Sequence, residues 1–316
     1  MENIFFSLSV VLPLFLTMFL GYFLRRVNVF SDDFIANCNK ACFQIFLPSL
    51  IFYSIYSNEG GFRSEIKTVT FTIVASSILI LLLVIVVPLI VKDKIKIGAV
   101  IQGLFRSNAV IFGIPLVMNL YGEGGIGPIS IIVAVIVPYF NFLTVIILSV
   151  FDVTKKVDTL LITKVLVDLI KNPLIIASLI ALFFDLTGII LPQFIVSTIK
   201  SISNVATPLS LMALGAAFRF HRLSHNIKYL LYICTFKMIL MPAAMVIIAI
   251  SLGFRNTQLA GLMVLYATPI AVSSYVMTRE ASGDYELAGQ LVVMSTFYSI
   301  FTIFLFIYVL RSLGYI

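Results

Sequence analysis

The sequence contains few charged residues for its length. Asp, Glu, Lys and Arg make up 11% of its 316 residues, and the mean hydropathy is +1.13. An average soluble domain has about 25% charged residues. A soluble protein of this size cannot bury so many apolar side chains. The composition therefore excludes a soluble enzyme and a disordered chain.

Cysteine is scarce, and the common catalytic motifs are missing. Cys38, Cys42 and Cys234 lie inside apolar stretches, so we expect small buried side chains, and a disulfide-rich secreted protein is excluded. No G-x-x-x-x-G-K-[ST] motif for ATP hydrolysis occurs. His221 and His225 have no evident third zinc ligand, and no nucleophile–base pair stands out. We therefore expect no enzyme activity, no cofactor and no bound metal.

The sequence does contain long, nearly continuous apolar runs. A helix needs about 20 apolar residues to cross a bilayer, whereas strands of an outer-membrane barrel alternate in polarity over about 10 residues. We therefore predict an all-α polytopic membrane protein. The ten runs cover residues 4–24, 34–57, 67–91, 97–121, 129–151, 173–191, 194–218, 227–252, 257–279 and 287–313.

The basic residues predict the orientation in the membrane. Most loop lysines and arginines follow the odd-numbered runs, as do Arg25, Arg26, Lys155 and Lys156. Because positive loops stay in the cytoplasm, we expect a multi-pass plasma (cell inner) membrane protein with both termini outside. This reading also explains the net charge of +7 without a nucleic-acid partner. No basic residue precedes the run 4–24, so we interpret it as a permanent span and not a signal peptide.

The two halves of the sequence resemble each other. Gln44 and Pro48 recur as Asn204 and Pro208, at a constant offset of 160 residues. With five runs in each half, the second copy must enter the membrane in the opposite direction. Inverted repeats of this kind are typical of carriers whose binding site lies at the midplane.

We therefore predict three parts in the chain. Residues 1–152 form a first five-helix repeat, and residues 173–316 form a second, inverted one. Residues 153–172 form a cytoplasmic linker, which we expect to be a short amphipathic surface helix.

The basic residues inside the runs include Lys40, Arg106 and Lys237. A charge at mid-depth costs about 2.5–3.5 kcal/mol, so Arg106 is expected to face protein or water. The acidic residue furthest inside a run, Asp185, lies near a span end and cannot neutralise three cations. The unmatched charge indicates an anionic ligand. The alternative is a structural role for Arg106, in an ion pair or against the carbonyls of a broken helix.

Polar side chains follow one face of two further runs. Asn37 and Gln44 do so in the run 34–57, and Ser201 and Asn204 in the run 194–218. We expect these side chains to line an aqueous path, and hydrogen bonding between helices is the alternative.

Two runs combine polar, small and helix-breaking residues near mid-depth. One contains Ser107 and Asn108 ahead of Pro115, and the other contains Thr268 and Pro269. A broken helix exposes backbone N–H groups and leaves partial positive charge at the start of its second half. Two such breaks that cross would form an anion site.

Several short motifs carry a family resemblance over nearly the whole chain. They are Leu20-Gly21-Tyr22 with Arg25-Arg26, Leu47-Pro48-Ser49-Leu50, Asn108 with Phe112-Gly113-Ile114-Pro115-Leu116, and Pro269 through Arg279-Glu280 to Gly283-Asp284. With these motifs the chain resembles the auxin efflux carrier family, which includes plant auxin transporters and bacterial organic-acid permeases.

The resemblance implies ten helices in two inverted five-helix repeats, with helices 4 and 9 broken where they cross. It also implies a scaffold, a transport domain, elevator-type alternating access and a homodimer. Asn108 falls on the family's carboxylate-binding asparagine, and Pro269 on the second crossover proline. Ser107 stands where plant members have proline, and Ile270 where they have a polar side chain. These departures favour a bacterial-type member with a substrate other than auxin.

We therefore predict a secondary carrier of small organic anions, such as dicarboxylates or auxin-like carboxylates. One alternative is a non-transporting membrane sensor that binds the same anion, and another is an intramembrane enzyme. The predicted substrate-binding residues are Arg106, Ser107, Asn108, Pro269, Ile270, Ala271, Asn37, Gln44, Ser201 and Asn204.

Overall fold

The computed structural model describes residues 1–58, 61–151, 171–217, 227–281 and 283–316, and every regular element in these ranges is a helix. Residues 153–170 of the predicted linker and both histidines lie outside the described residues. The elements are α1 (Glu2–Arg26), α2 (Asp32–Ala41), η1 (Cys42–Phe46), α3 (Leu47–Tyr56), α4 (Gly61–Ser64), α5 (Ile66–Ile90), α6 (Lys94–Phe105), η2 (Ala109–Gly113), α7 (Ile114–Tyr121), η3 (Glu123–Gly125), α8 (Gly127–Val150), α10 (Pro173–Thr187), α11 (Gln193–Ala217), α12 (Ile227–Thr235), η4 (Phe236–Leu240), α13 (Met241–Ser251), α14 (Asn256–Ala267), α15 (Ser273–Glu280) and α16 (Tyr285–Ser312).

Six helical stretches of the described chain are long and apolar enough to cross a bilayer. They are α1, α5, α6 with α7, α8, α12 with α13, and α16. Their outward faces carry large apolar side chains, such as Leu82 on α5 and Phe301 on α16. Such faces are expected of helices in contact with lipid. The all-helical, membrane-embedded class predicted from composition is therefore found in the fold.

Three helices widen into a π turn at the same distance before a proline. Each of η1, η2 and η4 spans five residues, and the next helix has proline as its second residue, at Pro48, Pro115 and Pro242. Proline lacks an N–H group, and its ring clashes with the carbonyl four residues earlier. A π turn at that point takes up the clash without ending the helix. These prolines therefore bend membrane helices that would otherwise be straight.

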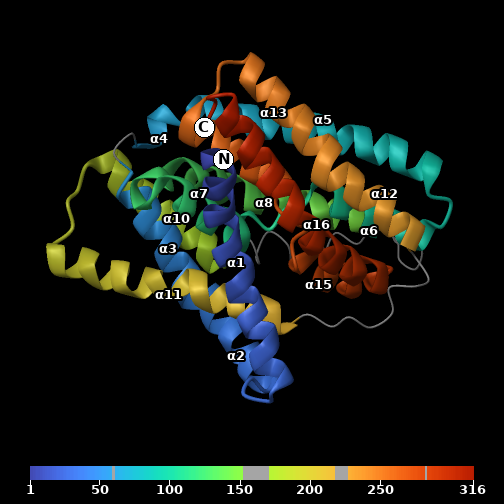
Figure 1. Ribbon diagram of the computed structural model, residues 1–316, viewed down its shortest axis with the longest axis horizontal. Helices are drawn as coiled ribbons and strands as arrows, with labels where there is room; N and C mark the ends of the chain where they lie inside the picture. The colour runs from blue at the N-terminus through green and yellow to red at the C-terminus, as the bar shows by residue number, and fades with distance from the viewer. Residues whose placement is uncertain (59–60, 152–170, 218–226, 282) are drawn as a thin grey trace.

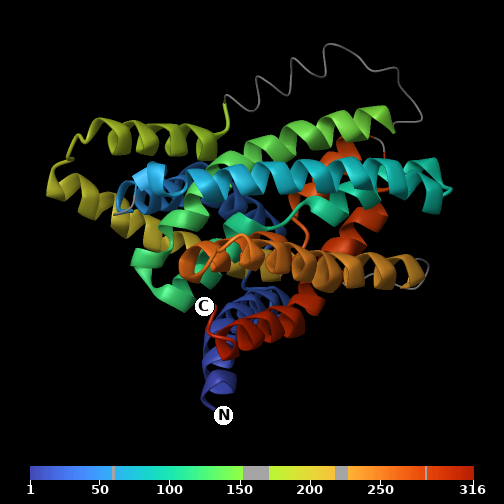
Figure 2. The same ribbon diagram turned by 90° about the horizontal axis from the view of Figure 1, so that it is seen from above.

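The helices pack in two groups, and each group takes helices from both halves of the sequence. In the first group, α1 packs along α11, α3 packs along α10, and α11 also contacts α3. The second group contains α5, α6 with η2, α7 and η3, α8, and α12 to α16 with η4. The two groups meet where α1 packs along α16 and α3 packs against α8. Figure 1 shows α2, α3 and α11 towards the lower left and α5, α12 and α13 towards the upper right, and Figure 2 shows α5 beside α8 and α16 beside α1.

Two glycines allow α1 and α11 to touch backbone to backbone. A Cβ atom at Gly21 would lie 2.0 Å from the carbonyl oxygen of Met212, and one at Gly215 would lie 1.9 Å from that of Met18. Only glycine fits at either position. Close contact through small residues is a common way for membrane helices to associate.

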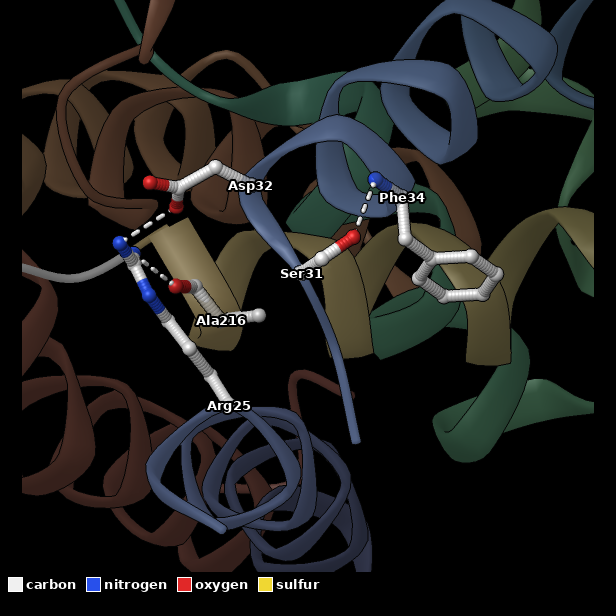
Figure 3. A network of polar contacts seen from close by, with 5 residues as sticks. All are labelled: Arg25, Ser31, Asp32, Phe34 and Ala216. Carbon is white, nitrogen blue, oxygen red and sulfur yellow. Dashed lines mark hydrogen bonds and ion pairs between the residues drawn. The ribbon is translucent and has the colours of Figure 1, made fainter. Parts of the chain in front are cut away.

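Arg25 ties together the ends of α1, α2 and α11 (Figure 3). Its guanidinium donates to the carbonyl oxygen of Ala216 at 2.6 Å and to Asp32 Oδ1 at 2.7 Å. Ser31 begins α2 by accepting a hydrogen bond from the Phe34 N–H at 3.1 Å. Because the last carbonyls of a helix have no partner within it, the Arg25 contact satisfies one at the end of α11. The two chain ends also lie together, with Asn3 Nδ2 bonded to Ser312 Oγ at 3.1 Å.

Candidate binding site

The helix formed by α6 and α7 is interrupted at residues 106–108. Arg106 has extended backbone angles (φ −75°, ψ 132°), and Asn108 (φ −84°, ψ 53°) precedes η2. The helix formed by α14 and α15 is interrupted at residues 268–272, where Thr268 is also extended. Pro269 explains the second break, because a residue before proline is pushed out of the helical region. Both breaks therefore occur where the sequence predicts them.

The two breaks meet through their backbones. We call the place where residues 106–108 meet residues 268–272 the crossing. The N–H group of Asn108 donates to the carbonyl oxygen of Pro269 at 2.8 Å. The N–H group of Ile270 donates to Ser295 Oγ on α16 at 3.0 Å. Two of the amides that we expected to be free for a ligand are thus used within the protein. Among the described residues, none accepts a hydrogen bond from the N–H groups of Ala109, Val110 or Ala271, which begin or precede the second half-helices.

Arg106 is buried where the first break meets two other helices. Its guanidinium donates to Asn141 Oδ1 at 2.8 Å and to Thr144 Oγ1 at 3.3 Å on α8, and to Ser273 Oγ at 2.8 Å on α15. It also contacts the sulfur of Met277. All four partners are neutral. Arg106 therefore fixes the end of α6 and adds positive charge that no ion pair within the described chain cancels.

Lys237 is the second buried cation at the crossing, although the sequence-based set of binding residues omits it. It lies in η4 and is fully buried, and its ammonium group donates to Ser107 Oγ at 2.5 Å and to the carbonyl oxygen of Tyr266 at 3.3 Å. Tyr266 is in the last turn of α14, where helix carbonyls lack partners and a positive charge is favourable. The sequence signal for this residue was a lysine inside an apolar run.

Several polar groups at the crossing have no protein partner. The Asn108 side chain is 7% exposed, and within the described residues its amide makes no hydrogen bond. The hydroxyl oxygens of Thr268 and Ser274 and the side-chain oxygen Oε1 of Gln102 are buried, also without a partner in the described chain. Buried polar groups are normally hydrogen-bonded. The crossing therefore holds hydrogen-bonding capacity that a ligand or water could use.

The predicted binding residues fall in two places. Arg106, Ser107, Asn108, Pro269, Ile270 and Ala271 all lie at the crossing. Asn37, Gln44, Ser201 and Asn204 are exposed on α2, η1 and α11, in the first packing group. A groove of about 430 Å³ between η1 and α11 is lined by Phe46, Ser197, Thr198, Ser201, Ile202 and Val205. These four polar side chains, which we call the polar stripes, therefore lie on an exposed surface of the single chain, whereas Arg106 and Asn108 are buried.

Comparison with known proteins gives the family. Residues 6–307 match the family described as membrane transport protein. The chain belongs to this family. It is the auxin efflux carrier family whose motifs the sequence carries, so that recognition is confirmed. The family consists of membrane transporters.

Two relatives match this transporter over nearly its whole length. An uncharacterized transporter of Methanothermobacter thermautotrophicus is 22% identical over 296 residues, which cover 93% of this chain and 95% of the relative. An uncharacterized transporter of Methanocaldococcus jannaschii is 22% identical over 317 residues, which cover 96% of this chain and 99% of the relative. This chain is thus similar to transporters whose names give no substrate.

Proposed function

We propose that this transporter is a secondary carrier that moves small organic anions across the plasma membrane. The observation that carries the proposal is the hydrogen bond from the Asn108 N–H to the Pro269 carbonyl, which joins two helix breaks beside the buried cations Arg106 and Lys237. Neither cation forms an ion pair within the described chain. A buried charge without a partner is costly, and an anionic substrate would supply the missing countercharge.

Each part of the crossing has a role in binding a carboxylate. The Asn108 side-chain amide donates to a carboxylate oxygen, as do the N–H groups of Ala109 and Val110 at the start of η2. The partial positive charge at a helix N-terminus favours the same anion. Arg106 adds positive potential while its own hydrogen bonds remain in place. Ser107, Ile270 and Ala271 shape the backbone around the anion.

The packing supports ten membrane segments in two inverted repeats. The first segment of one half, α1, packs along the second segment of the other half, α11. In the same way α10, the first segment of the second half, packs along α3. This reciprocal pairing is what two inverted copies of one five-helix unit produce. With an even number of spans both termini lie on one side, which we assign to the outside.

The two packing groups suggest how the site changes sides. Both helix breaks and both cations belong to the second group, whereas α1, α3, α10 and α11 form the first. In an elevator mechanism the group that holds the anion moves against the other. One polar contact between the groups is the hydrogen bond from Asn119 Nδ2 on α7 to the Val10 carbonyl oxygen on α1 at 2.9 Å. Such contacts could be exchanged without unfolding either group.

The exposed polar stripes support a homodimer. Asn37, Gln44, Ser201 and Asn204 are exposed on helices that otherwise face lipid. Polar side chains in a bilayer are satisfied by neighbouring helices. A second copy of this chain against α2, η1 and α11 would cover them and fill the groove beside Phe46.

The function can be tested with purified protein in liposomes. Vesicles loaded with unlabelled lactate or malate are diluted into the same labelled anion, and uptake by exchange is measured. A carrier gives uptake that depends on the internal anion. A sensor that only binds the anion raises thermal stability with the same compounds but gives no uptake. Absence of uptake with a broad set of carboxylates would contradict the proposal.

A further inference from the structure

Lys237 is unusual because its charge is enclosed by neutral groups. Its side chain is 0% exposed, and its hydrogen-bond partners are the Ser107 hydroxyl at 2.5 Å and the Tyr266 carbonyl at 3.3 Å. Transferring an ammonium ion to such a place costs several kcal/mol unless a negative charge accompanies it. The helix end at Tyr266 and the Ser107 hydroxyl offset only part of this cost, because neither carries a full negative charge.

Among the described residues, the elements around η4 supply no buried carboxylate. The elements packed against it are α6, α12, α13, α14 and α16. Their buried ionisable residues are Cys234 on α12, Tyr266 on α14 and Arg106 after α6. The Tyr266 hydroxyl is engaged with Ser76 at 3.1 Å, and Arg106 donates towards α8 and α15. The described part of this environment therefore leaves the ammonium without a counter-ion.

On α16 the nearest acid is far from the crossing. The charged residues of α16 are Glu286 in its first turn and Arg311 in its last turn. A further ionisable residue, Tyr298, is half-buried. The crossing lies at the level of Ser295, which accepts a hydrogen bond from the Ile270 N–H. Glu286 is nine residues before Ser295, which is about 14 Å along the helix axis. No ion pair between Glu286 and Lys237 occurs in the described chain.

The same two contacts also suit an uncharged amine. A protonated Lys237 donates to the Ser107 oxygen and to the Tyr266 carbonyl. A neutral amine still donates to the Tyr266 carbonyl, and its lone pair accepts a hydrogen bond from the Ser107 hydroxyl, which can turn to donate. The site therefore accommodates lysine with or without its proton. Arginine does not offer this choice, because it stays protonated in proteins.

Anion binding and proton binding must then favour each other. Ser107 joins Lys237 to Asn108, the residue that we propose to bind the carboxylate, so an anion at Asn108 lies close to the ammonium. An anion there stabilises the charged lysine, and by linkage the proton strengthens anion binding by the same factor. When the anion leaves, the affinity of the amine for its proton falls by that factor.

We propose that Lys237 is the proton-carrying group of this transporter, which binds one proton from water together with the anion and releases it with the anion on the other side. The inference rests on the proposed carrier function. The loaded site carries the ammonium and the carboxylate, and the empty site carries a neutral amine. A pH gradient would therefore drive the anion uphill in the direction of the proton.

Two measurements on liposomes separate this inference from the carrier function. Exchange of labelled lactate or malate at equal pH on both sides tests the carrier. Accumulation of the same anion with an acidic outside tests the coupling, and a trapped pH dye reports whether protons enter with the anion. For one proton per monoanion we expect about tenfold accumulation per pH unit, because one pH unit is a tenfold ratio of proton concentration. Exchange without accumulation and without proton entry would overturn the inference and leave the carrier function intact.

The variants Lys237→Arg and Lys237→Gln locate the proton. The readout is the ratio of gradient-driven accumulation to exchange at equal pH, so a variant with low overall activity is still informative. We expect both variants to lose the gradient-driven part, since Arg keeps its proton and Gln has none to carry. Lys40→Arg, at the exposed end of α2, is the matched control and should accumulate as the wild type does. If Lys237→Arg accumulates the anion to the wild-type ratio, Lys237 is not the proton carrier.

Discussion

The N–H group of Asn108 donates to the carbonyl oxygen of Pro269 at 2.8 Å, so two helix breaks far apart in the sequence are joined main chain to main chain. No side chain takes part in this bond. The crossing can therefore keep its geometry when side chains around it change, and the Asn108 amide remains available for a ligand. Side-chain substitutions at this position should separate binding from folding.

Asn108→Ala should weaken anion binding without unfolding the protein. A hydrogen bond to a charged group contributes about 1.5–3 kcal/mol, so the affinity should fall by roughly ten- to a hundredfold. The backbone bond to Pro269 is retained, so thermal stability without ligand should change little. Anion-dependent thermal shift and exchange in liposomes measure the two effects. Asn39→Ala in α2 is the control, and wild-type affinity in Asn108→Ala would remove Asn108 from the site.

Arg106→Gln should lower anion affinity through the loss of positive potential. At an effective dielectric constant of 20, two unit charges about 8 Å apart interact by about 2 kcal/mol, so an affinity loss of at least about tenfold is expected. Removal of the buried charge offsets part of the lost hydrogen bonding to Asn141 and Ser273, so the protein should still fold. The dissociation constants of Arg106→Gln and of the exposed control Arg26→Gln should be compared. Equal affinities would show that Arg106 is purely structural.

The positions of the breaks could be predicted from the sequence, but their contact could not. Ser107, Asn108 and Pro269 interrupt apolar runs, and such interruptions are local signals. The bond between the two breaks depends on how whole helices pack. The use of the Ile270 N–H by Ser295 likewise depends on a hydroxyl from another helix. Local chemistry thus predicts the positions of the breaks at the candidate site, and tertiary packing decides which of their amides are free.

The polar stripes show a second limit of sequence reasoning. Helical spacing correctly places Ser201 and Asn204 on one face of α11, and that face is exposed. Spacing alone does not distinguish a face that lines a substrate path from a face that packs against a second copy of the chain. Lys237 shows the same limit, since its charge is evident in the sequence but its partners Ser107 and Tyr266 are not.

Cross-linking residues 123 and 200 should stop transport. Lys200 Nζ on α11 lies 2.6 Å from Glu123 Oε2 in η3, so this ion pair joins the two packing groups. Both side chains are partly exposed, and such pairs contribute about 0.2–1 kcal/mol, so the single substitutions should be mild. In an elevator mechanism a covalent link between the groups would block their relative movement. The doubly substituted Glu123→Cys/Lys200→Cys protein, with the native cysteines removed, should lose exchange on treatment with a short thiol cross-linker.

Each single cysteine variant treated with the same reagent is the control for this experiment. Reduction of a disulfide formed directly between the two positions should restore exchange. Full exchange by a protein shown to be cross-linked would contradict movement between the two groups.

Gly21→Ala and Gly215→Ala should destabilise the pairing of α1 with α11. The added Cβ would lie 2.0 Å from the Met212 carbonyl oxygen or 1.9 Å from that of Met18, and backbone atoms cannot move aside as a side chain can. Overpacking costs about 1–3 kcal/mol in a core, and contact with backbone should lie at or above the upper end of that range. Gly124→Ala is the matched control, because nothing lies within 4 Å of its Cβ. Size-exclusion profiles after heating should show early loss of the folded peak for Gly21→Ala and Gly215→Ala, whereas wild-type stability in both would mean that α1 and α11 do not touch as described.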